Sequence, residues 1–78
     1  MKNLEIQELQ LGQTYHIRNG FAKTQDELWF NNSKLVNIDA EWPMPTMLTF
    51  ILENGKEIVI DGDFINNTKH YQIINRGA

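Results

Sequence analysis

The chain contains no cysteine, and this absence excludes thiol catalysis and disulfide bonds within its 78 residues. It also has no proline- or glycine-rich tract that would act as a linker. No stretch approaches the roughly 20 apolar residues of a membrane span, and the first residues lack the apolar run of a signal peptide. These absences predict one small domain, residues 1–78, in a reducing cytoplasm.

Basic clusters are also missing from the chain. Ten acidic residues stand against seven basic ones, and no two basic residues are adjacent. Phosphate contacts supply most of the affinity of nucleic-acid-binding proteins, so this distribution disfavours a nucleic-acid partner. The acidic balance favours a protein partner that carries a basic surface.

Catalytic patterns are missing as well. The only serine, Ser33, falls in Asn31-Asn32-Ser33, which we interpret as a turn rather than a nucleophile elbow. His16 and His70 lie far apart and lack the spacing of metal ligands. Asp61-Gly62-Asp63 suits a turn better than a calcium loop, which needs further oxygen ligands. The sequence therefore predicts no enzyme activity, no cofactor and no metal site.

The clearest positive signal is residues 47–61, where two apolar runs flank Asn54-Gly55, as in a β-hairpin. A two-residue turn would pair Phe50 with Val59 and bring acidic residues onto the apolar face. A three-residue loop with a left-handed Gly55 pairs Phe50 with Ile58 instead. We favour this second register because it gathers the apolar residues on one face. Three apolar residues then remain on the outer face: Met47, Ile51 and Val59.

Shorter patterns predict the remaining elements. Residues 15–18 and 28–30 suit short strands, and Asn31-Asn32-Ser33 would break the second of them. Residues 36–42 alternate, which predicts a strand ended by Pro43-Met44-Pro45. Its core-facing residues would be Val36, Ile38, Ala40 and Trp42.

The two ends of the chain are less regular. Residues 4–11 fit either an irregular segment or a short helix, and Gly12 would end both. Residues 64–67 predict a helical turn that Asp63 could cap. Residues 70–75 predict a last strand with Tyr71 facing the core.

The order of these elements is a first strand, a long excursion over residues 19–34, a three-strand meander, a helical turn and a closing strand. This order resembles the SH3-like small β-barrel over residues 13–75, with residues 1–12 as a lead-in. The resemblance implies an all-β fold: an antiparallel barrel or rolled sheet of five to six strands. Because such barrels host many unrelated roles, it implies no particular function.

The function hypothesis rests on charge and on candidate surface residues. We expect a non-catalytic, acidic protein-binding module, in which exposed aromatic residues, Met44 and acidic side chains contact a partner. The candidate partner-binding residues are Trp29, Asp39, Glu41, Trp42, Met44, Glu57, Asp61 and Asp63, and Asp26 and Glu27 belong to the same acidic set.

A narrower form of the hypothesis concerns origin. Asn and Ile occur nine times each and Ala three times, a bias that follows AT-rich coding sequences such as those of many phages. This suggests a phage or mobile-element inhibitor of a host nucleic-acid-handling or defence protein, of the anti-CRISPR kind. Two alternatives stay open: a nucleic-acid-binding small barrel that stacks bases on aromatic residues, and a homo-oligomeric assembly subunit.

Overall fold

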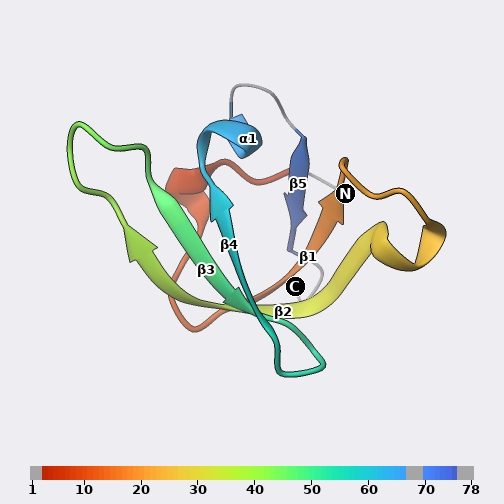
Figure 1. Cartoon of the computed structure of the whole chain (residues 1–78). Coiled ribbons are helices and arrows are strands. Elements are labelled where there is room, and N and C mark those ends of the chain that lie inside the picture. The colour runs from red at the N-terminus through yellow and green to blue at the C-terminus, as the bar shows by residue number, and fades with distance from the viewer. Residues whose placement is uncertain (1–2, 67–69, 76–78) are drawn as a thin grey trace.

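Five antiparallel strands form one sheet, in the order β4-β3-β2-β1-β5 (Figure 1). The computed structural model describes residues 3–66 and 70–75, with the side chain of Asn66 excepted. The elements in chain order are η1 (Ile6–Glu8), β1 (Thr14–Asn19), η2 (Gln25–Glu27), β2 (Trp29–Asp39), β3 (Met47–Ile51), β4 (Glu57–Asp61), α1 (Asp63–Asn66) and β5 (Tyr71–Ile74). The predicted mainly-β class, with a helical turn before the last strand, is confirmed.

The β3–β4 hairpin has the register that the burial argument favours. Leu48 pairs with Ile60 and Phe50 with Ile58, and Gly55 has φ +88° in a three-residue loop. Leu48 and Phe50 are fully buried. The apolar pattern of the two strands was therefore enough to choose between two turns that differ by one residue.

Strand β2 does not break at Asn31-Asn32-Ser33, so that prediction is wrong. The strand continues through these residues to Asp39, and its register against β1 shifts by one residue between the Tyr15–Ser33 and Ile17–Phe30 pairs. Asn32 occupies the bulge with φ +54°, a conformation that asparagine tolerates better than most residues. The turn-like residues thus bend the strand without ending it, and Ser33 is buried within it.

The predicted alternation over residues 36–42 is wrong, because β2 contains a second bulge. The register against β3 shifts between the Leu35–Phe50 and Asn37–Thr49 pairs, which leaves Val36 as the extra residue. Leu35 is fully buried, whereas Val36 is 39% exposed and Trp42 is 93% exposed. As the extra residue of the bulge, Val36 lies on the outer face of the sheet. Trp42 is outside the strand altogether, because β2 ends at Asp39. Only Ile38 of the four predicted core residues packs against the core.

The core lies inside the curl of the sheet, and the N-terminal segment covers one side of it. Its buried residues are Leu9, Tyr15, Ile17, Leu35, Leu48, Phe50, Ile60, Ile65 and Ile73. The ambiguity over residues 4–11 resolves as one 3-10 turn, and the Leu4 N–H donates to the carbonyl of Ile73 at the β5 edge. Figure 1 shows β2 curving beneath the molecule, from beside β1 to beside β3.

The predicted last strand is present as β5, and it pairs with β1. The helical turn before it begins at Asp63, and the Asp61 carboxylate accepts a hydrogen bond from the Asp63 N–H (2.9 Å). Residue 67, the last of the predicted helical turn, lies outside the described residues. Tyr71 is half-buried against the core. Among the helices of the described residues, none has the length and apolar composition that a membrane crossing requires.

Candidate functional site

Among the described residues, the two most exposed large apolar side chains both belong to the loop between β2 and β3. Trp42 is 93% exposed and Met44 is 68% exposed. The Met44 N–H donates to the carbonyl of Glu41 (2.8 Å), which closes a tight turn around Trp42 and Pro43. Because proline has a fixed φ, this turn presents its two apolar side chains at a small cost in conformational entropy.

Acidic residues border this turn on the outer face of the sheet. Asp39 pairs with Met47, and Met47 pairs with Asp61, so the three side chains form one row across β2, β3 and β4. Two strand spacings separate the ends of the row, or roughly 10 Å. The Gly62 N–H donates to the carbonyl of Thr46 (2.7 Å), which brings the start of α1 beside this row.

The fold therefore places six of the eight predicted partner-binding residues at one end of the sheet, in the β2–β3 loop and at or just beyond the adjoining ends of β2 and β4. We call this region the Trp42 surface; it comprises Asp39, Glu41, Trp42, Met44, Met47, Asp61 and Asp63. Between residues 37 and 66 the only basic residue is Lys56, which lies beyond the other end of the hairpin. The Trp42 surface thus combines an exposed apolar turn with four carboxyl groups at the same end of the sheet.

The other two predicted residues lie elsewhere. Glu57 pairs with Ile51 at the opposite end of the β3–β4 hairpin. Trp29 begins β2 and is 39% exposed, while the adjacent Phe30 packs against the core. Trp29 therefore faces outward at the start of β2, and Phe30 faces the core.

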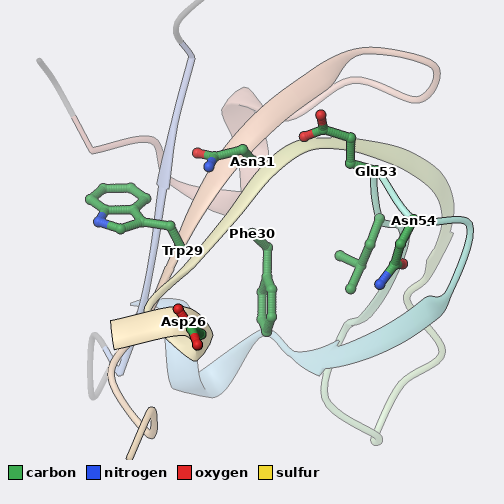
Figure 2. A pocket seen from close by; sticks show the side chains of 7 residues that line it. Asp26, Trp29, Phe30, Asn31, Glu53 and Asn54 are labelled. Carbon is green, nitrogen blue, oxygen red and sulfur yellow. The ribbon is translucent and has the colours of Figure 1, made fainter. Parts of the chain in front are cut away.

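A shallow cavity of about 280 Å³ opens between the start of β2 and the β3–β4 loop. Its lining residues, which we call the Phe30 pocket, are Asp26, Trp29, Phe30, Asn31, Leu52, Glu53 and Asn54. Figure 2 shows the Phe30 ring extending into the gap between η2 and the hairpin loop, with Asp26 near its tip and Glu53 across the gap. The lining thus combines two aromatic residues, one aliphatic side chain, two carboxyl groups and two amides, with no basic residue.

Hydrogen bonds fix the polar rim of the Phe30 pocket. The Asn32 amide donates to Oε2 of Glu53 (3.2 Å), which ties the bulge in β2 to the hairpin loop. Nδ1 of His16 donates to Oδ1 of Asn31 (3.0 Å). Bulges commonly redirect side chains beside functional sites, and here the Asn32 bulge directs two consecutive amide side chains to the rim.

A third surface feature is an aromatic cluster built from three separate segments. Phe21 stacks on His70, with ring centroids 4.6 Å apart, and meets Phe64 edge-on at 5.5 Å. Phe21 and Phe64 are 47% and 39% exposed. Gly20 makes this approach feasible, because its N–H donates to the His70 carbonyl (2.7 Å) at a spacing that leaves no room for a Cβ atom.

Sequence reasoning missed the aromatic cluster and most of the Phe30 pocket. No sequence pattern indicated that the Phe30, Leu52 and Glu53 side chains would line one pocket. They come from β2 and the hairpin loop, which meet η2 only because the sheet curls. The pair Asn31-Asn32 was the one local signal: consecutive asparagines within an apolar strand pattern indicate a left-handed residue at a bulge.

Within residues 3–66 and 70–75, no three acidic or histidine side chains lie where they could hold a metal ion together. The Ser33 hydroxyl is buried and donates to the carbonyl of Phe30 (3.2 Å), which is a structural role. Comparisons of the chain with protein-family models, with curated proteins and with solved structures found no significant match.

Proposed function

We propose that this chain is a non-catalytic protein-binding module that docks through the Trp42 surface. The observation that carries the proposal is the 93% exposure of Trp42 on a closed turn, beside a row of carboxyl groups on the sheet. Tryptophan and methionine are enriched in the centres of protein interfaces, and charged groups are typical of their rims. The partner that fits is a protein with an apolar pocket bordered by basic side chains.

Burial of Trp42 in a partner would supply several kcal/mol of binding free energy. A buried aromatic side chain removes about 150–250 Å² from water, which at about 25 cal/mol per Å² is roughly 4–6 kcal/mol before the costs of association. Trp42 obtains almost none of this within the folded chain. The four carboxyl groups add steering toward a basic partner, an effect that salt screens.

A finer form of the proposal concerns architecture and role. The strand order, with a helical turn between β4 and β5, supports an SH3-like small barrel as the scaffold. An acidic surface that occupies the basic groove of a nucleic-acid-handling protein would make the module an inhibitor. A phage or mobile-element origin and a cytoplasmic location belong to this form of the proposal.

The test is affinity capture with three tagged forms of the chain, in lysate treated with nuclease. The forms are the wild type, Trp42→Ser/Met44→Ser, and Leu11→Ser as a matched control, because Leu11 is 59% exposed outside the Trp42 surface. We expect a stoichiometric protein that the wild type and the control retain and the double variant loses. Reversing Asp39 and Glu41 to lysine should weaken binding at low salt and flatten its salt dependence.

Three outcomes would overturn the proposal. Capture that disappears with nuclease would favour the nucleic-acid alternative. A mass that grows with concentration, with no other protein bound, would favour a homo-oligomeric subunit. Equal capture by all three forms would show that binding occurs away from the Trp42 surface.

A further inference from the structure

We infer that the Phe30 pocket is a subsite for the side chain of an arginine presented by the protein partner. This inference rests on the proposed function for the source of the arginine. It concerns a different part of the surface, at the far end of the β3–β4 hairpin from Trp42. The inference draws on the size, the charge and the shape of the cavity.

Size limits what the Phe30 pocket can hold. Its volume of about 280 Å³ lies just below the roughly 300–1,000 Å³ of pockets that enclose drug-sized ligands. A single extended side chain fits such a space, whereas a dinucleotide or another large cofactor does not. The pocket is shallow and open to solvent, so a side chain can enter from a docked protein.

Charge selects a cation for the pocket. Asp26 and Glu53 are the only charged residues among those that line it, and they come from separate elements on either side of the Phe30 ring. The Asn32 amide holds Oε2 of Glu53, so this carboxylate is already oriented before a ligand arrives. A pre-oriented carboxylate loses less side-chain entropy when it forms an ion pair.

Shape favours a guanidinium over an ammonium group. The guanidinium is planar, stacks on aromatic faces and pairs with a carboxylate through two parallel hydrogen bonds. Phe30 offers the ring and Leu52 offers an aliphatic wall for the methylene groups. Phe30 cannot easily turn away, because it is half-buried against the core and paired with Ile17 of β1. Lysine would use the charge of the pocket but not its flat wall.

The experiment is a titration of the full chain, labelled with nitrogen-15, by the capped tripeptide acetyl-Gly-Arg-Gly-amide at low salt. We expect saturable shifts of the backbone amide signals of Asp26, Phe30, Leu52 and Glu53. The matching tripeptide with citrulline, which keeps the shape and removes the charge, should cause no such shifts. The lysine tripeptide should bind more weakly than the arginine one.

Variants locate the binding. Asp26→Asn and Glu53→Gln should each weaken the arginine tripeptide about two- to fivefold, the range of exposed ion pairs. Glu5→Gln makes the same change of charge on the N-terminal segment, whose Ile6 lies against Gly62 at the other end of the β3–β4 hairpin, and should leave the affinity within error of the wild type. Trp42→Ser should also leave it unchanged, so the pocket is tested independently of the Trp42 surface.

Other results would overturn the inference. Equal shifts with citrulline, or no shifts at all, would show that the pocket does not select a cation. Equal affinity for the lysine and arginine tripeptides would show that the pocket does not distinguish a guanidinium from an ammonium group. Agmatine is a small molecule that carries the guanidinium group and an amine. If it bound more tightly than the arginine tripeptide, the ligand of the pocket would be a small molecule instead of a protein side chain. A partner captured through Trp42 would stand under any of these results.

Discussion

Replacing Trp42 by alanine should leave the stability of the fold almost unchanged. The side chain is 93% exposed, so less than a tenth of it touches the protein. A fully buried aromatic side chain removes about 150–250 Å² from water, and a tenth of that is worth roughly 0.5 kcal/mol at about 25 cal/mol per Å². The reference variant is Leu48→Ala, because Leu48 is fully buried and such a truncation costs about 2–5 kcal/mol.

Urea unfolding of the wild type and both variants measures the difference, since the midpoint shifts with the free energy of unfolding when the slope is constant. Fluorescence gives a second reading in a Trp29→Phe background, where Trp42 is the only tryptophan. Its emission should match that of free tryptophan and should be quenched readily by acrylamide. If Trp42→Ala lost more than about 2 kcal/mol, the ring would be a core residue, and the Trp42 surface would not exist as described.

Three further predictions concern the backbone and are also read from urea midpoints. Gly20→Ala should lower the free energy of unfolding by about 1–3 kcal/mol, because the added Cβ would clash with the carbonyl of His70. Gly55→Ala should lower it by only about 1 kcal/mol, because the space around Gly55 is open and the only cost is the left-handed φ of +88°. Asn32→Val should cost about 1–2 kcal/mol at the φ +54° bulge, and Asn32→Gly should stay within about 0.5 kcal/mol of the wild type. Asp61→Ala should lose about 1 kcal/mol, because its carboxylate no longer accepts the N–H that begins α1.

The fold was most predictable where the apolar pattern and the turn agreed. In the β3–β4 hairpin, one register buried Leu48, Phe50 and Ile60 together, and the alternative exposed part of that set while drawing acidic residues inward. A one-residue slip has a large energetic consequence there, so the pattern was decisive. The closing strand was predictable for the same reason, because its alternation places Ile73 in the core.

Strand β2 was unpredictable because two of its positions break the two-residue period. A sequence pattern assumes that successive side chains alternate without interruption, but each bulge adds one residue and exchanges the faces beyond it. Val36 and Ile38 therefore lie on opposite faces although they are two residues apart. Local propensity could not reveal this, since the bulges are fixed by pairing with β1 on one side and β3 on the other.

The same two irregularities link the fold to both candidate sites. The bulge at Asn32 directs its amide to Glu53 and shapes the Phe30 pocket. The bulge at Val36 restores Ile38 to the core and turns Asp39 outward, so the strand ends on the acidic row beside Trp42. Met47 and Glu53 mark the two sites on one stiff hairpin, roughly 20 Å apart along the strand at about 3.4 Å per residue. Under the proposed function, a partner docked on Trp42 would raise the effective concentration of its own arginine at the Phe30 pocket, and a subsite too weak to bind alone would then still contribute to affinity and register.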